Sequence, residues 1–456
     1  MANRGTNNGS YSNCYSEGYC PDSLDGIMTT AKNIAMTYKA QGGQGISLSK
    51  IRPKGSMIGN KFKSDGIVPF MEIFNTVTES VSQGGSRKGA LLMSLDINHP
   101  EAETFMTIKS DLKRINKANL SMEIDDEFMH RVISGDKEAN RLFNILSEQA
   151  CKYAEPGVIF TNRFRNYNLM EYVSAYEIET CNPCGEQPLK KQLSCNLSSI
   201  NLSEYVKNPF TKNAIFDYDL LAKHIPIYVK AMDDVLDENL PNHPLPEHRE
   251  NIEYWRNQGI GIMGLHDMLI KLGIVYGSEQ SVDFISNLIN KIFKLAVWAS
   301  VDLAKKRGSF PGYEPAIWDS EIIKYNFTET EIEDLKKTNC LRNCSLLSIA
   351  PTGSIGTMFS ISTGVEPWFA KSYIRNTKSL NGAQDVSYEV WAPVIKTAMD
   401  TNWHPETLIT SNDINYHGRI KVQAALQNSI DTAISSTLNL PKTTTPEQIR
   451  EIYIEA

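Results

Sequence analysis

Segments with strand character and segments with helix character alternate along this chain, and this alternation is what most restricts its fold. Residues 22–41 carry apolar side chains at helical spacing and end at two glycines, so the pattern predicts a helix. Residues 281–306 predict a second, longer helix. Short apolar runs at 90–96 and 346–350 are typical of buried strands. The alternation favours an α/β architecture, and because no change in composition marks a boundary we expect one domain over residues 1–456.

The charge and cysteine content exclude several classes of partner and location. The net charge is −7, so we expect no broad basic surface for nucleic acid or an anionic membrane. No run of about 18 apolar residues occurs, and the small, polar first ten residues are unlike a secretory signal. In such a chain the eight cysteines are expected to be reduced thiols rather than a disulfide framework. These features predict a cytoplasmic protein.

The most informative segment is residues 181–189, with the sequence Cys-Asn-Pro-Cys-Gly-Glu-Gln-Pro-Leu. Its two prolines and one glycine exclude a regular helix, so we expect an extended or looped backbone. In an extended backbone alternate side chains share a face and lie about 6.6 Å apart. Asn182, Cys184 and Glu186 would therefore point toward one ligand. Together they offer a hydrogen-bonding amide, a sulfur centre and a general base.

Other interpretations of this segment remain open on the residues alone. Cys181 and Cys184 have the Cys-x-x-Cys spacing of a thioredoxin-like redox pair, or of half a zinc site. A zinc site needs a second pair, and Cys340 with Cys344 is a poor match with no histidine cluster nearby. We therefore expect no metal site, while the choice between structural and catalytic cysteines stays open.

A glycine-rich pattern at residues 259–264 is weaker evidence. It fits G-x-G-x-x-G, but a dinucleotide fingerprint needs a preceding strand and an acidic residue about 20 positions later. The preceding residues 250–258 are polar and helix-like, and no clear acidic partner follows. We interpret these glycines as sites of close helix packing.

Longer motifs give the chain a resemblance to ribonucleotide reductases. Asn-Pro-Cys-Gly-Glu at 182–186, followed by Ser-Cys-Asn-Leu-Ser-Ser-Ile-Asn-Leu at 194–202, resembles the active-site finger loop of that family. Similar stretches follow the family's order at 12–24, 47–55, 83–90, 350–355 and 364–367. Below, residues 181–189 are called the finger loop.

The resemblance implies a role for each of five residues. Cys184 would be the thiyl radical that removes the 3′ hydrogen of a ribose. Glu186 would take the proton of the 3′-hydroxyl, and Asn182 would hold the sugar hydroxyls. Cys14 and Cys195 would supply two electrons as water leaves C2′, and would form a disulfide that exchange with a dithiol reverses. They lie 181 positions apart, so only folding can bring their Cα atoms within the roughly 4 to 7 Å of a disulfide.

The resemblance also implies a substrate-phosphate loop. Backbone N–H groups and two hydroxyls can bind an anion without Lys or Arg, and a glycine permits close backbone approach. Taken alone, the segment is more typical of an ordinary turn. The loop residues are Pro351, Thr352, Gly353, Ser354 and Ile355.

Two further binding assignments follow from the resemblance. Asn13 and Gly43 would contribute to the substrate site. A deoxynucleotide effector would bind near Asp22, with adjustable loops at residues 57–66 and 108–119.

The fold implied by the resemblance is a ten-stranded α/β barrel of two five-stranded halves, whose centre receives the finger loop with its radical cysteine. Burial there protects a thiyl radical from water and from other thiols. The implied activity is reduction of ribonucleotides to 2′-deoxyribonucleotides for DNA synthesis, as in ribonucleoside-diphosphate reductases. Diphosphate and triphosphate substrates both stay open. Residues 1–456 would form the barrel domain, incomplete at both ends.

The class of reductase decides the cofactor. The sequences around residues 351–354 and 423–441 resemble those of class II enzymes, which implies adenosylcobalamin as the cofactor. A class I large subunit would instead draw its radical from a ferritin-like partner. Either class implies a ribonucleoside di- or triphosphate substrate, deoxynucleotide or ATP effectors and a thioredoxin-like reductant. A homodimer, or a companion fragment that supplies the missing ends, is also compatible with the resemblance.

Two hypotheses outside ribonucleotide reduction remain. Cys181 departs from the family pattern, where a small residue or threonine is expected. A thiol–disulfide oxidoreductase that uses Cys181 and Cys184 would lose thiol exchange in Cys184→Ser and would ignore ribonucleotides. A non-catalytic remnant would bind nucleotides without turnover.

Overall fold

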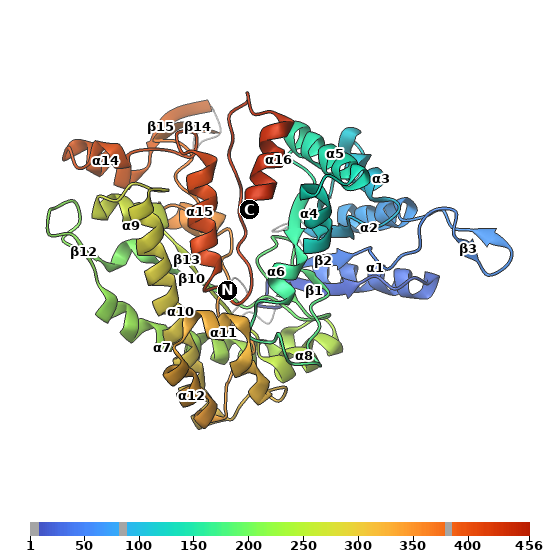
Figure 1. Ribbon diagram of the computed structural model, residues 1–456, viewed down its shortest axis with the longest axis horizontal. Coiled ribbons are helices and arrows are strands. Elements are labelled where there is room, and N and C mark those ends of the chain that lie inside the picture. Colours follow the sequence, from blue (N-terminus) through green and yellow to red (C-terminus); the bar gives the residue numbers. More distant parts are fainter. Residues whose placement is uncertain (1–8, 82–88, 379–384) are drawn as a thin grey trace.

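The computed structural model describes residues 9–81, 89–378 and 385–456, and its first half is built on one sheet (Figure 1). Five parallel strands lie in the order β1, β2, β5, β6 and β7. Their bounds are Cys14–Tyr19, Gly43–Ser47, Leu91–Asp96, Ala118–Ile124 and Gly157–Phe160. The strand predicted at 90–96 is confirmed as β5, in the middle of the sheet. Most of the motif at 83–90 lies outside the described residues.

Helices connect these strands and pack against the sheet. α1 (Leu24–Lys39) confirms the helix predicted at 22–41, and the Ser23 side chain caps it by accepting from the Gly26 N–H. Its apolar face, including Ile34 and Tyr38, is buried in one hydrophobic cluster with residues of β2, β5 and β6. The other helices of this half are α2 (Val68–Ser80), α3 (Ala102–Thr107), α4 (Asp126–Ile133), α5 (Lys137–Tyr153) and α6 (Thr161–Arg165).

A second set of parallel segments forms the other half. β10 (Leu197–Asn201) pairs with β13 (Gly259–Met263). Single parallel bridges then join Ile260 to Leu347 and Ile349 to Ile434. Among the described residues this half thus has four parallel segments beside the five strands of the first half, one fewer than the five expected for it. The strand predicted at 346–350 takes part through these bridges.

The prediction of helix packing at the glycine-rich segment is wrong, because residues 259–263 form the barrel strand β13. Every residue of β13 is buried, so the segment lacks the polar alternation that would have marked a strand. A Cβ at Gly261 would lie 2.4 Å from the Ser348 carbonyl oxygen. The glycine therefore permits close approach of neighbouring barrel segments.

Helices of the second half surround its parallel segments (Figure 1). α10 (Glu279–Arg307) confirms the long helix predicted at 281–306. The fully buried Asp233 accepts hydrogen bonds from Arg256, Arg307 and Arg342 at 2.7–3.2 Å, which joins three chain segments to the helix that carries Asp233. The remaining helices are α7 (Tyr218–Asn239), α8 (Pro246–Trp255), α9 (Leu265–Leu272), α11 (Glu321–Asn326), α12 (Glu329–Thr338), α13 (Gly353–Phe359), α14 (Pro393–Asp400), α15 (Tyr416–Gln427) and α16 (Pro446–Glu455).

The two halves meet at an antiparallel junction, called the seam below. β1 lies beside residues 192–195, which lead into β10, and Tyr15 bridges Ser194. The Cys195 N–H donates to the Cys14 carbonyl at 2.8 Å, and the Ser16 N–H donates to the Leu193 carbonyl at 2.9 Å. The seam therefore places residues of β1 opposite the chain that leaves the finger loop.

Peripheral elements complete the molecule. The β3–β4 hairpin (Met57–Ile58 and Phe62–Lys63) projects away from the barrel, at the right of Figure 1. β14 (Ser372–Lys378) and β15 (Asp385–Trp391) form another hairpin, and β11 (Val206–Lys207) pairs with β12 (Ile215–Phe216). None of the described helices is both long enough and apolar enough to cross a membrane.

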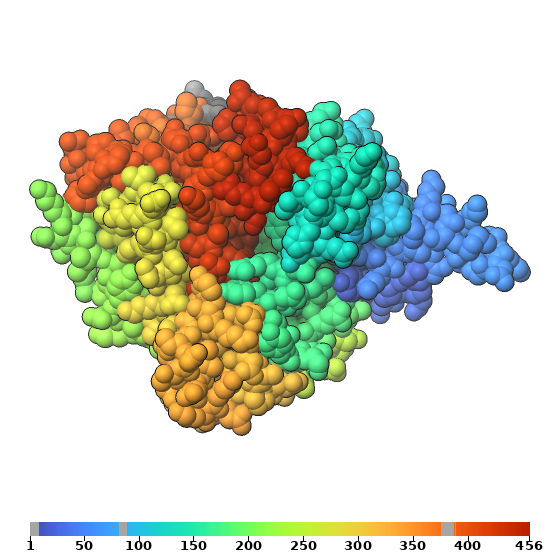
Figure 2. Space-filling view, viewed as in Figure 1, coloured from blue at the N-terminus to red at the C-terminus, as the bar shows by residue number. Residues whose placement is uncertain are grey.

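α16 connects the two halves on the outside of the barrel. Its Arg450 donates to Asn144 of α5 at 3.2 Å, while Glu451 accepts from Tyr416 of α15 at 3.3 Å. In the space-filling view the red C-terminal segment lies against the teal segment that includes α5 (Figure 2).

Candidate active site

The finger loop is a short hairpin with a closed tip. β8 (Thr180–Cys181) pairs with β9 (Pro188–Leu189). Between them the Asn182 N–H donates to the Gln187 carbonyl at 3.0 Å, and the Gln187 N–H donates to Asn182 Oδ1 at 3.0 Å. Gly185 adopts a positive φ of 82° at the turn, a conformation that glycine adopts without strain. The predicted looped backbone is confirmed.

Small residues on β2 allow the loop to enter the barrel. A Cβ at Gly45 would lie 1.8 Å from the Cys181 carbonyl oxygen, so no larger residue fits there. A Cβ at Gly43 would lie 3.1 Å from the Pro183 ring. On the opposite side, Ser348 Oγ and the Ala433 N–H both donate to the Glu186 carbonyl, at 2.8 and 3.0 Å. The loop is thus held between the two halves.

Three cysteines converge where the finger loop meets the seam. Cys184 is exposed, whereas Cys14 and Cys195 are buried on facing strands. The Cys14 thiol lies close enough to the thiols of Cys184 and Cys195 for both to change its pKa. Its pKa lies well above the usual value, because the contact with Cys195 and burial outweigh the lowering effect of Cys184. Burial raises the pKa of Cys195 to about 11, so both buried cysteines are thiols near neutral pH.

Glu186 and Asn182 form the polar part of this site. Asn182 Nδ2 donates to Glu186 Oε1 at 2.9 Å, whereas Oε2 has no protein partner in the described part of the chain. Burial raises the pKa of Glu186 to about 7. A carboxyl group with this pKa can accept or release a proton near neutral pH. The structure thus brings together all five residues predicted to carry the chemistry.

Cys181, the residue that departs from the family pattern, lies on β8 and is 1% exposed. Its pKa is raised by burial first and then by the charges of Glu123 and Glu186. A buried thiol is a poor nucleophile because its thiolate is disfavoured. This environment does not favour Cys181 as half of an exchanging redox pair. Among the described residues, no cluster of three or more metal-ligating side chains occurs.

The predicted phosphate loop follows the barrel segment that contains Ser348. Its residues are exposed or half-buried, and Thr352 has a positive φ of 52° at the start of α13. Thr352 Oγ1 accepts from the Gly364 N–H at 2.7 Å, which fixes the loop against the Gly364-Val365-Glu366-Pro367 motif. The loop prediction is wrong for its last three residues, because Gly353, Ser354 and Ile355 form the first turn of the short helix α13.

The remaining predicted binding residues lie on the first half. Asn13 is exposed, and its carbonyl accepts from the Gly43 N–H at 2.7 Å, beside the seam. Asp22 precedes α1 and forms an ion pair with Arg52 at 2.7 Å. Arg52 also lies 3.4 Å from the carbonyl of Met57, at the base of the β3–β4 hairpin. Asp22 is thus linked to the predicted adjustable loop at 57–66.

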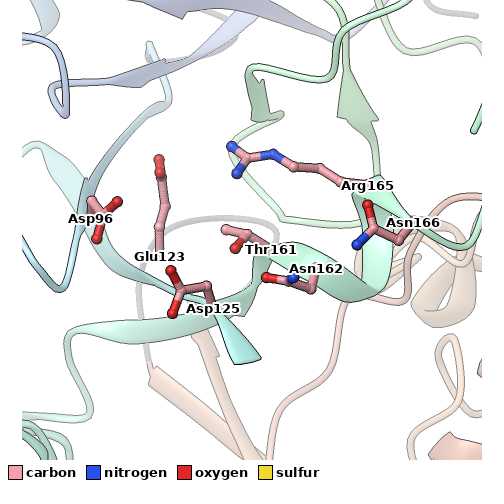
Figure 3. A pocket seen from close by; sticks show the side chains of 7 residues that line it. All are labelled: Asp96, Glu123, Asp125, Thr161, Asn162, Arg165 and Asn166. Atoms are coloured by element: carbon pink, nitrogen blue, oxygen red, sulfur yellow. The ribbon is translucent and has the colours of Figure 1, made fainter. Parts of the chain in front are cut away.

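A polar cavity of about 150 Å³ lies near the base of the finger loop, and sequence reasoning missed it (Figure 3). Ser94 Oγ donates to Glu123 and lies 3.3 Å from Thr180 Oγ1 of β8, which connects the cavity wall to the finger loop. Burial raises the pKa of Glu123. The lining residues come from separate strand ends and from α6, so no compact sequence motif indicates the cavity. They are Asp96, Glu123, Asp125, Thr161, Asn162, Arg165 and Asn166.

Comparison with known proteins agrees with this geometry. Residues 12–139 and 135–456 match the family described as "Ribonucleotide reductase, barrel domain", and the chain belongs to this family. A protein of Thermoplasma acidophilum named vitamin B12-dependent ribonucleoside-diphosphate reductase is 31% identical over 99% of this chain. A protein of the same name from Mycobacterium tuberculosis is 30% identical over the whole chain. The chain spans 60% and 67% of the lengths of these two relatives.

A solved structure gives independent support for the fold. The class Id ribonucleotide reductase alpha subunit of Actinobacillus ureae superposes with a TM-score of 0.80 at 21% identity, over 99% of this chain and 82% of that one. The predicted α/β barrel is therefore confirmed.

Proposed function

We propose that this chain reduces ribonucleotides to 2′-deoxyribonucleotides by radical chemistry. Membership of the reductase barrel family supports the reaction type. The observation that carries the proposal is the convergence of Cys184 with Cys14 and Cys195, beside the hydrogen-bonded pair Asn182 and Glu186. This set provides a radical sulfur, two reducing thiols and a proton acceptor around one space.

Each residue has one task in the proposed mechanism. Cys184 as a thiyl radical takes the hydrogen atom from C3′, and the Glu186 carboxylate takes the proton of the 3′-hydroxyl. The 2′-hydroxyl then leaves as water, with a proton from the Cys14–Cys195 pair. That pair also supplies two electrons and the second hydrogen, which forms the new C2′–H bond, and it becomes a disulfide. The hydrogen atom then returns from Cys184 to C3′, and Glu186 returns its proton to the 3′-oxygen. The balance is ribonucleotide plus two thiols giving deoxyribonucleotide, disulfide and water, and Cys184 is regenerated.

The position of Glu186 suits its task. Its Oε2 is free of protein hydrogen bonds among the described residues, and can accept from a substrate hydroxyl. Its Oε1 is held by Asn182 at 2.9 Å, which fixes the carboxyl plane. With a pKa of about 7 it holds a proton part of the time at neutral pH, so proton transfer in either direction has a small free-energy cost.

Adenosylcobalamin is the radical source that we propose, because the relatives of 30–31% identity carry the name vitamin B12-dependent. The accessibility of the finger loop fits such a group, since Cys184 is exposed and Gly185 half-buried while the rest of the tip is buried. Cys184 and Gly185 would face the cofactor. When bound, the cofactor supplies the oxidising equivalent that removes the hydrogen atom of the Cys184 thiol.

The other ligands follow the same assignment. The exposed loop 351–355 would bind the substrate phosphates, with Asn13 and Gly43 at the sugar end of the site. A deoxynucleotide or ATP effector would bind near Asp22. A thioredoxin-like dithiol would reduce the Cys14–Cys195 disulfide after each turnover.

The test is deoxyribonucleotide formation from each ribonucleoside diphosphate and triphosphate, with dithiothreitol, a deoxynucleotide effector and adenosylcobalamin. We expect product that requires cobalamin and disappears in Cys184→Ala. Cys340→Ala is the matched control, because Cys340 is also accessible but lies against the Val301 carbonyl, away from the site. Nucleotide binding without product, with the relatives' additional segments and a ferritin-like subunit also supplied, would contradict the proposal.

The class I alternative gives a different result in the same assay. Proteins named ribonucleoside-diphosphate reductase subunit alpha, such as that of Chlamydia muridarum, are 25% identical over 83% of this chain. Deoxyribonucleotide formation that requires a ferritin-like subunit and does not depend on cobalamin would support this alternative.

A further inference from the structure

Six buried polar side chains form a connected cluster at the seam, and the proposed chemistry gives them no role. Each is at most 5% exposed. They come from the segment before β1, from β1 itself, from the facing segment before β10, from the end of α7 and from the residues that follow α7. The six residues, called the seam clamp below, are Ser10, Ser12, Tyr15, Ser194, Asn239 and His243.

Asn239, the last residue of α7, is the centre of the seam clamp. Its Oδ1 accepts from the Tyr11 N–H at 2.7 Å and from Ser10 Oγ at 3.3 Å. Its Nδ2 donates to Ser12 Oγ at 3.0 Å and lies 3.2 Å from His243 Nε2. A helix of the second half is thereby attached to the segment that leads into β1.

The same cluster reaches the facing strand. Ser12 Oγ lies 3.0 Å from Ser194 Oγ, within hydrogen-bond distance. Ser12 is two residues before Cys14, and Ser194 directly precedes Cys195. One amide side chain, that of Asn239, therefore connects the backbone positions that carry both cysteines.

Tyr15, the residue that directly follows Cys14, is fixed by contacts of its own. Its hydroxyl lies 2.7 Å from Ser10 Oγ and 3.0 Å from His243 Nδ1. Its ring stacks on His248, with centroids 4.5 Å apart and planes at 27°. A Cβ at Gly42 would lie 2.5 Å from this ring, so the glycine provides the space that the ring occupies.

One placement of protons agrees with the hydrogen-bond distances of the cluster. Neutral His243 donates from Nδ1 to the Tyr15 oxygen, and the Tyr15 hydroxyl donates to Ser10. Ser10 donates to Asn239 Oδ1, and the amide N–H groups of Asn239 donate to Ser12 and to His243 Nε2. Hydrogen bonds arranged in such a chain strengthen one another, which makes the cluster rigid.

We propose that the seam clamp sets the separation of the Cys14 and Cys195 thiols, so that Tyr15 and Asn239 are positioning residues for this redox pair. The proposal rests on the proposed function, because it assumes that the two thiols alternate with a disulfide. Disulfide geometry is narrow, and small displacements of the backbone make the bond less favourable. A rigid connection on both sides of Cys14 and next to Cys195 therefore favours disulfide formation.

The chain contains a matched control for a change at Tyr15. Tyr38 is also fully buried, and its hydroxyl forms a 3.0 Å hydrogen bond with Thr78 Oγ1. Tyr38 belongs to α1, and its hydroxyl contacts α2, away from the seam. Replacement of either tyrosine by phenylalanine removes one buried hydroxyl, so a general loss of stability affects both variants alike.

The experiment is a redox titration of the full chain in glutathione buffers, followed by acid quenching and alkylation. The reaction is two protein thiols plus oxidised glutathione giving the protein disulfide and two reduced glutathiones. After trypsin, Cys14 lies in the peptide 5–32 and Cys195 in the peptide 192–207, so their cross-link has a unique mass. Fragmentation separates Cys14 from Cys20, and the measurement needs neither cofactor nor substrate.

We expect Tyr15→Phe to lower the equilibrium constant for the Cys14–Cys195 disulfide about fivefold, the effect of one lost buried hydrogen bond, and Tyr38→Phe to leave it unchanged. A shift in neither variant, or an equal shift in both, would overturn the proposal. If the wild-type chain forms no such disulfide, the reducing role of the pair fails and the seam clamp fails with it.

A second variant covers the case in which Tyr15→Phe does not fold. Ser12→Ala removes the link to Ser194 and leaves the Tyr15 ring in place. It should lower the same equilibrium constant, and an unchanged value would count against the proposal.

Discussion

Replacement of Glu186 by glutamine should make this protein more stable above neutral pH while it removes activity. In the folded chain burial raises the pKa of Glu186 to about 7 from an ordinary value of 4.5. Between these two pH values the folded chain holds a proton that the unfolded chain has lost. The stability contributed by the protonated carboxyl is thus complete below about pH 4.5 and is lost as the pH rises to about 7. Glutamine stays neutral throughout this range.

The size of the effect follows from the shift. A rise from 4.5 to about 7, at about 1.4 kcal/mol for each pH unit, corresponds to about 3 kcal/mol. The Asn182 hydrogen bond to Oε1 can be retained by the glutamine carbonyl. The free-energy difference between Glu186→Gln and wild type should therefore grow by about 3 kcal/mol in favour of the variant between pH 4.5 and pH 8.

The assay is urea unfolding at several pH values, and Glu17→Gln is the matched control. Glu17 is also buried, accepts from Asn33 through Oε1 at 2.7 Å, leaves Oε2 without a protein partner in the described residues, and has a pKa raised to about 7 by burial. Both variants should gain stability at high pH, but only Glu186→Gln should stop deoxyribonucleotide formation. A stability difference at Glu186 that stays constant from pH 4.5 to 8 would refute the reasoning.

Three further predictions follow from packing, charge and exposure. Gly45→Ala should displace the finger loop, because its Cβ would lie 1.8 Å from the Cys181 carbonyl oxygen. Product formation should fall about 100-fold, and retention of full activity would contradict the geometry. Asp233→Asn should cost about 3–5 kcal/mol in urea unfolding, because it removes the buried carboxylate that accepts hydrogen bonds from Arg256, Arg307 and Arg342. Asp237→Asn, at a carboxylate that is 49% exposed, should cost less than about 1 kcal/mol. Iodoacetamide should modify Cys184 before the buried Cys181, and fragmentation of the peptide 166–190 would reveal the reverse order.

The sequence predicts the chemistry of the finger loop better than the fold around it. Two prolines and a glycine limit residues 181–189 to a loop, and that loop positions Asn182 and Glu186 as expected. The pairing of Cys14 with Cys195 needed the family resemblance, because no local pattern links residues 181 positions apart. β13 was misinterpreted because a strand buried on both faces lacks alternation.

Other parts of the site have no signal in the sequence. The cavity near Glu123 is lined from separate strand ends, and each polar residue there resembles an ordinary turn residue. The seam clamp joins Ser12 to Asn239, at the end of a helix 227 positions further along the chain. A polar residue at a helix terminus most often caps the helix, so its long-range role becomes visible only after the two halves meet.

Because of the antiparallel seam, the proposed redox cycle would also change the stability of the barrel. The two thiols belong to different half-barrels, so their disulfide would be a covalent cross-link between those halves. A cross-link that closes a loop of this length constrains the unfolded chain by about 5 kcal/mol. Each turnover would therefore convert the barrel from a form without the cross-link to a cross-linked form. The free energy of unfolding would then report the fraction of the enzyme that is still oxidised.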